Sequence, residues 1–95
     1  MTAEEWIHRG ESLSALGKYD EAIGCFDTAI KVKPKDTSAW DYKGATLIIQ
    51  GKYDEAIMCF DTAIMINPKD ETAIEGRRRC RRRLLSITNQ THDHT

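Results

Sequence analysis

The sequence GKYDEAIGCFDTAI at residues 17–30 recurs as GKYDEAIMCFDTAI at residues 51–64. The two copies start 34 residues apart, since 51 − 17 = 34, and they differ at one aligned position, Gly24 against Met58. A period of this length is typical of stacked helical hairpins, because a single hairpin cannot bury its apolar face without neighbours. The duplication therefore predicts an all-α array.

Apolar and small residues recur at three- and four-residue steps on both sides of Gly17, which is the spacing of one buried helix face. We predict one helix before Gly17 and another from about Tyr19 to Pro34, because glycine allows a tight reversal and proline stops a helix. The second unit has the same punctuation at Gly51 and Pro68. Each unit is thus predicted to be a helical hairpin.

A fifth helix is predicted over residues 71–86, because KDETA at 69–73 echoes KDTSA at 35–39, where the second unit begins. Beyond that point only one narrow apolar stripe continues, as a terminal capping helix requires. We expect residues 89–95 to form a disordered tail, because they contain too few apolar side chains to dock. A single domain is therefore expected to span residues 1–88.

The composition is that of a soluble domain, with 95 residues, 40% apolar and 31% charged. The acidic start does not resemble a secretory signal, and no apolar run could cross a bilayer, so we expect a cytoplasmic protein. The cysteines form no CxxC pair and no serine or cysteine has a histidine partner at an activating spacing. We therefore expect buried thiols, no enzyme activity, no cofactor and no metal site.

The order Trp, Gly, Leu, Gly, Tyr, Ala, Phe, Ala, Pro runs from Trp6 to Pro34 and again from Trp40 to Pro68. This order resembles the tetratricopeptide repeat, over repeats at about 2–35 and 36–69, and implies a right-handed superhelix of hairpins. The leucine usual before the first glycine of the motif is replaced by Arg9 and Lys43. Long basic side chains can lay their stems along apolar surface, so we expect altered packing there and no loss of the fold.

The resemblance also implies that the first helix of each hairpin lines a concave groove, which binds a protein or peptide partner. We expect Ile7, Ile48 and Ile49 to form an apolar floor, unless neighbouring helices cover the last two. Two repeats bury less surface than the usual three, so we also expect a homodimer. The candidate groove residues are Ile7, Glu11, Asp41, Ala45, Ile48 and Ile49.

One subclass of the family holds the C-terminal carboxylate of heat-shock chaperones in a clamp of lysine and asparagine side chains. Neither residue type occupies the matching positions of this chain, so the resemblance implies no such clamp here. The matching positions are Ile7, Glu11, Tyr42, Thr72 and Gly76.

Six arginines are concentrated in two turns of the predicted fifth helix. A solvated basic cap is the interpretation we favour, and binding of RNA or another polyanion is the alternative. No aromatic residues are interleaved for base stacking, which counts against RNA. The arginines could also meet Glu4, Glu5 and Glu11 of a second copy. This basic patch comprises Arg77, Arg78, Arg79, Arg81, Arg82 and Arg83.

Overall fold

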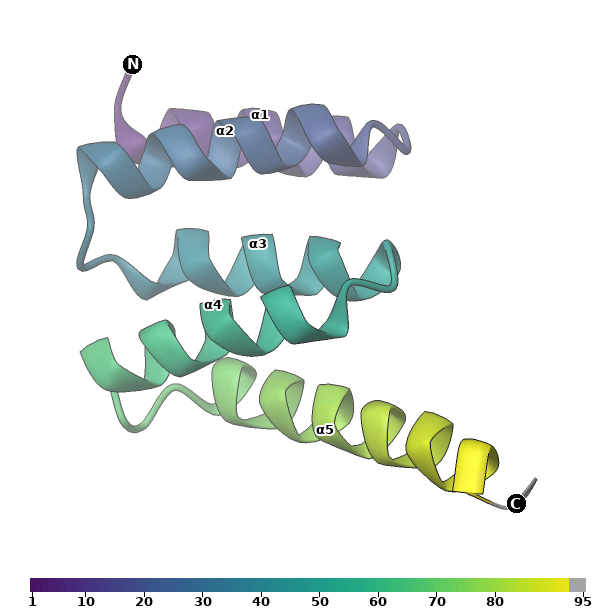
Figure 1. Ribbon diagram of the computed structural model, residues 1–95. Coiled ribbons are helices and arrows are strands. Elements are labelled where there is room, and N and C mark those ends of the chain that lie inside the picture. The colour runs from purple at the N-terminus through teal and green to yellow at the C-terminus, as the bar shows by residue number, and fades with distance from the viewer. Residues whose placement is uncertain (93–95) are drawn as a thin grey trace.

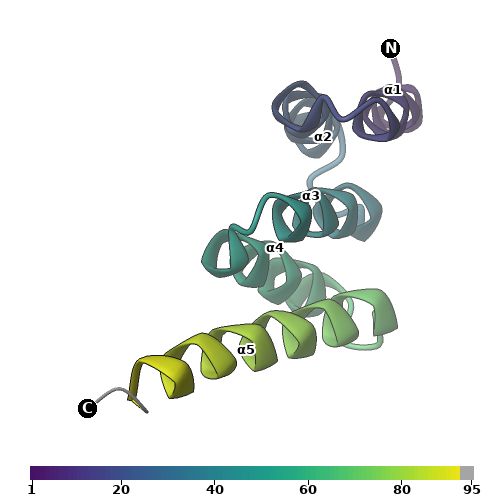
Figure 2. The same cartoon turned by 90° about the vertical axis from the view of Figure 1, so that its right-hand side faces the viewer.

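The computed structural model describes residues 1–92, with side chains to residue 86, and this part contains five helices and no strand. Figure 1 shows two successive hairpins followed by a longer helix. Helices α1 and α3 lie in one layer and α2 and α4 in the other, and α5 begins beneath α3 and crosses beneath α4 (Figure 2). The expected hairpin-repeat fold is confirmed. The bounds are α1 Ala3–Ala15, α2 Tyr19–Val32, α3 Thr37–Ile49, α4 Tyr53–Ile66 and α5 Glu71–His92.

The helix boundaries follow from local chemistry. Thr2 and Glu5 form a reciprocal capping box, in which each side chain accepts a hydrogen bond from the other residue's backbone amide, at 3.2 and 3.0 Å. The Asp36 carboxylate caps α3 by accepting from the amide of Ser38 at 3.0 Å. Gly17 and Gly51 reverse the chain with φ of 79° and 76°, which a side chain would strain.

The two hairpin layers approach closely because small residues face phenylalanine rings. A Cβ atom built on Gly10 would lie 2.5 Å from the ring of Phe26, and one on Gly44 would lie 2.6 Å from that of Phe60. Helix α5 also packs closely on Phe60, because a Cβ on Gly76 would lie 2.5 Å from the ring. Both rings are buried, so glycine at these positions sets the distance between helices.

The two basic positions that depart from the repeat pattern have a structural explanation. Lys43 of the second repeat pairs with Asp27 of the first, with Nζ and Oδ1 2.6 Å apart. Arg77 of α5 occupies the same position of the repeat as Lys43, and its Nη1 lies 3.0 Å from Oδ1 of Asp61. Arg9, at the start of the array, lies over the ring of Trp6 at 5.8 Å from its centroid. Lys43 and Arg77 therefore each connect their unit to the one before it.

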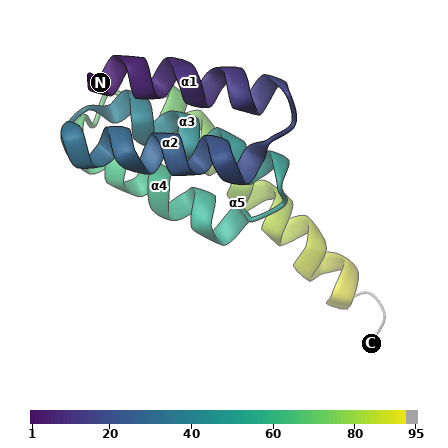
Figure 3. The ribbon, with the colours of Figure 1, turned by 90° about the horizontal axis from the view of Figure 1, so that it is seen from above.

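Helix α5 is longer than the sequence analysis predicted. It continues to His92 instead of ending at 86, so residues 89–92 are helical and not part of a disordered tail. The sequence contains no glycine or proline after Gly76 that would stop the helix. Residues 93–95 of the expected tail lie outside the described residues. The second half of α5 projects past the N-terminal end of α4 (Figure 3).

Candidate functional site

A concave groove runs along the layer formed by α1, α3 and the start of α5. It consists of two adjoining cavities of about 220 and 300 Å³, which share Tyr42 and Ala45. The first is lined by Glu11, Ser14, Ala15, Phe26, Tyr42, Ala45, Thr46 and Ile49. The second is lined by Ser38, Asp41, Tyr42, Ala45 and Thr72.

Tyr42 stands between the two cavities and is fixed from two directions. Its ring stacks on that of Phe26, with centroids 5.6 Å apart and planes 15° from parallel. A hydrogen bond to the Glu11 carboxylate, with smaller effects of burial and of the Glu11 charge, raises the pKa of Tyr42. The phenol is therefore a neutral donor at physiological pH, and it holds α3 against α1 at the centre of the groove.

The carboxyl group of Asp41, which lines the second cavity, interacts with that of Asp70 beside it. Oδ1 of Asp41 and Oδ2 of Asp70 are buried and have no hydrogen-bond donor among the described residues. Burial, followed by a hydrogen bond to Asp70 and the charges of Asp70 and Asp36, raises the pKa of Asp41 from 3.8 to about 8. The Asp41 carboxyl is therefore largely protonated at neutral pH, which reduces the repulsion between the two buried groups.

The predicted groove residues divide between surface and core. Glu11, Asp41, Ala45 and Ile49 line the groove, and Ile49 is 59% exposed. Ile48 is half-buried and packs against the core around Leu47 and Phe60.

The placement of Ile7 in an open groove floor was wrong. Its side chain is 7% exposed and packs in a core cluster with Ala3 and Ala22. Ala39, at the start of α3, belongs to the same cluster, so the following repeat helps to cover Ile7.

The structure adds two residues to the site that the sequence analysis did not include in it. Tyr42 occupies one of the clamp positions of the family, and the signal for its role in the groove is an aromatic residue in the first helix of a hairpin. Asp70 lies beside Asp41 because it caps α5, where its Oδ1 accepts from the amide of Ala73 at 3.2 Å. The sequence contains a signal for this position, because Asp70 follows Asp36 by one 34-residue period and so is expected to cap α5 as Asp36 caps α3.

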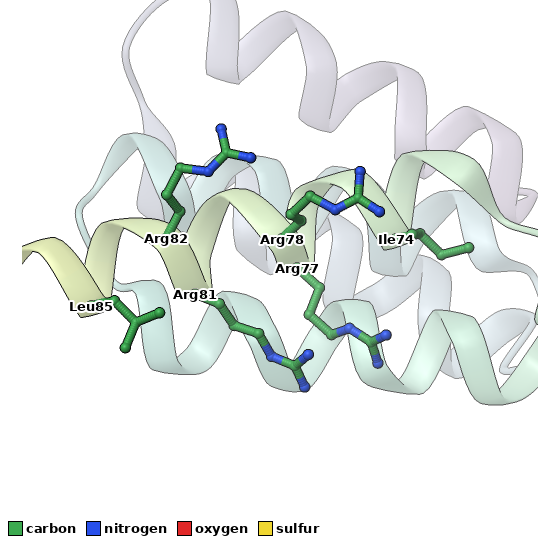
Figure 4. A pocket seen from close by; sticks show the side chains of 6 residues that line it. All are labelled: Ile74, Arg77, Arg78, Arg81, Arg82 and Leu85. Atoms are coloured by element: carbon green, nitrogen blue, oxygen red, sulfur yellow. The ribbon is translucent and has the colours of Figure 1, made fainter.

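The six arginines divide between a cavity on α5 and the surface outside it. Four of its members, with two apolar residues, line a cavity of about 380 Å³ on α5 (Figure 4), which we call the arginine-lined face. Arg79 and Arg83 are exposed but do not line this cavity. In Figure 4, Arg77 and Arg81 point to one side of it and Arg78 and Arg82 to the other. The face comprises Ile74, Arg77, Arg78, Arg81, Arg82 and Leu85.

The three cysteines, Cys25, Cys59 and Cys80, are free and buried, as expected. Burial raises the pKa of Cys59 to about 11, and it also raises that of Cys80. Within the described residues, no group of three metal-ligating side chains comes together, and none of the helices is long and apolar enough to span a membrane.

Comparison with known proteins matches residues 3–36 and 37–70 to family models of the tetratricopeptide repeat. No curated protein matches the chain. The second TPR of Spaghetti (RPAP3), bound to HSP90 peptide SRMEEVD, superposes with a TM-score of 0.85 at 22% identity, over 99% of this chain and 87% of that chain.

Two further solved structures have the same fold. The Arabidopsis OM64 TPR domain gives a TM-score of 0.81 at 22% identity, over 86% of this chain and 68% of that one. The second TPR domain of human RPAP3, in complex with HSP70 peptide SGPTIEEVD, gives 0.79 at 22% identity, over 84% and 67%.

Proposed function

The chain belongs to the tetratricopeptide repeat family, and we propose that it is a non-catalytic scaffold that binds a peptide segment of another protein in the concave groove. The observation that carries the proposal is the exposed apolar surface of Ile49 and Ala45, which face the groove cavities from a helix whose other side is buried. An extended or helical peptide could bury these side chains, since apolar contacts in pockets supply most of the affinity of such complexes.

The charge of the groove favours a neutral or basic apolar peptide. Glu11, Asp41 and Asp70 place carboxyl groups in or beside the two cavities, and no lysine or arginine lines either one. Acidic segments such as SRMEEVD and SGPTIEEVD, the peptides bound in the similar structures, would meet like charge here. The absence of the lysine and asparagine clamp supports the same conclusion.

The test is a selection of random 12-residue peptides on the immobilised protein, followed by titration of the enriched peptides. Ile49→Asp introduces a charge into the groove, and Met65→Asp makes the same change at an 84% exposed residue of α4 that lines neither cavity. We expect Ile49→Asp to weaken binding about tenfold or more and Met65→Asp to change it less than about twofold. Equal affinities for both variants would exclude the groove.

We further propose a cytoplasmic location, and a homodimer as the alternative to a peptide-bound monomer, because two repeats bury less surface than three. Light scattering with and without the selected peptide separates these states. A mass of one chain at all micromolar concentrations would refute the homodimer, whereas a dimer that the peptide dissociates would show a second copy occupying the groove.

A further inference from the structure

The arginine-lined face of α5 occupies the positions that α1 and α3 use to contact the second helix of their own hairpins. When the repeats are aligned with the 34-residue period, Ile74 corresponds to Trp40, Arg78 to Gly44 and Arg81 to Leu47. Gly44 packs against Phe60 of α4, and Leu47 is buried in the core that α4 helps to form. None of the described residues covers the equivalent face of α5, which remains open (Figure 4).

This face cannot accept the kind of helix that covers α1 and α3. A single Cβ atom at Gly44 would already lie 2.6 Å from Phe60, and α5 has the whole side chain of Arg78 at that position. A helix bearing a phenylalanine there could not approach as closely as α4 approaches α3. Any helix on this face must therefore stand further away and present side chains that suit guanidinium groups.

The charge of the face is largely uncompensated. Arg81 and Arg82 form no salt bridge with any side chain that the structure describes. Arg78 pairs only with Glu75, at 3.2 Å on the exposed surface of the same helix, which contributes little. Arg77 already pairs with Asp61 of α4.

Apolar side chains mark the two ends of the face. Ile74 is half-buried at one end, and Leu85 is 62% exposed at the other. They are eleven positions apart, which corresponds to about 16 Å along a helix. A partner helix of about three turns could contact both.

We propose that the arginine-lined face docks an acidic amphipathic helix of a partner protein. Glutamate or aspartate side chains pair with Arg78, Arg81 and Arg82, and apolar residues near the two ends of the helix pack on Ile74 and Leu85. A polyanion such as RNA would use the arginines but not the apolar ends, and no aromatic residue lines the cavity for base stacking. This second surface is independent of the groove and goes beyond the proposed function.

The experiment titrates a labelled synthetic helical peptide, with leucines about eleven residues apart and four intervening glutamates, against the full chain by fluorescence anisotropy. The double variant Arg78→Glu/Arg82→Glu should weaken binding about tenfold or more. Arg79→Glu/Arg83→Glu makes the same charge change on the same helix outside the cavity, and should weaken it less than about threefold. Leu85→Ser should lower the affinity several-fold, about what one exposed apolar contact contributes.

Circular dichroism checks that each variant is folded, and Arg78→Gln/Arg82→Gln replaces the glutamate pair if it is not. Failure of the folded wild-type chain to bind the peptide would overturn the proposal, as would equal losses in the two double variants. Tighter binding of single-stranded oligouridine that Leu85→Ser leaves unchanged would indicate a polyanion surface instead. Ile49→Asp, which changes only the groove, should bind the acidic helical peptide as tightly as the wild type does. The proposed groove and the proposed arginine-lined face can therefore be refuted separately.

Discussion

Replacing Gly44 with alanine tests the close helix approach that positions the groove. The new Cβ atom would lie 2.6 Å from the Phe60 ring, whereas carbon atoms in good contact are about 3.5–4.0 Å apart. The ring has little room to retreat, because Gly76 of α5 also approaches it closely. Overpacking of a core costs about 1–3 kcal/mol, and the better helix propensity of alanine returns about 1 kcal/mol. The difference predicts a fall in the free energy of unfolding of up to about 2 kcal/mol.

The matched control is Gly24→Ala, at the one position where the duplicated stretches differ. Gly24 lies inside α2, and a Cβ atom there would meet nothing within 4 Å. Only the propensity gain remains, so this variant should be more stable than the wild type by about 0.5–1 kcal/mol. Urea unfolding followed by far-ultraviolet circular dichroism measures both changes. If Gly44→Ala proves as stable as Gly24→Ala, the close approach of α3 to Phe60 is wrong.

Three further predictions concern the charged and titratable groups. The pKa of Asp41 is raised from 3.8 to about 8 in the folded state, so folding takes up a proton at any pH between these two values. Thermal stability should therefore fall as the pH rises from about 5 to 8.5, and Asp41→Asn should flatten that dependence. A double-mutant cycle on Lys43 and Asp27 should give a coupling of about 0.5 kcal/mol that weakens in salt, and no coupling would exclude the inter-repeat salt bridge. Burial raises the pKa of Cys59 to about 11, so a thiol reagent at neutral pH should label Cys59 only after the chain unfolds, and urea should accelerate the labelling. Rapid labelling of the native chain would contradict the burial of this thiol.

The fold was predictable because its determinants are local and occur twice. Gly17 and Gly51 mark the turns, and the 34-residue period fixes which helix faces are buried. The end of α5 was not predictable from its narrow apolar stripe, because a helix without glycine or proline can continue on backbone hydrogen bonds after its packing partners end.

The groove was predictable in outline but not residue by residue. The family pattern places Ile7 and Asp41 at equivalent positions, yet Ile7 is buried by contacts that include Ala39 of the next repeat. The Asp41 and Asp70 pair also depends on two chain segments meeting, which no single-repeat pattern contains. Likewise, Lys43 departs from the leucine of the family pattern, and the reason lies in its salt bridge to Asp27 of the preceding repeat.

The central claim is that the concave groove is the peptide-binding surface. The most direct measurement is the change in backbone amide NMR shifts when a peptide from the selection is added to the ¹⁵N-labelled chain. We predict that the largest changes fall on Ala15, Tyr42, Ala45 and Ile49, with little change at Met65 on α4. Changes concentrated on α2 and α4, with the groove residues unmoved, would contradict the account.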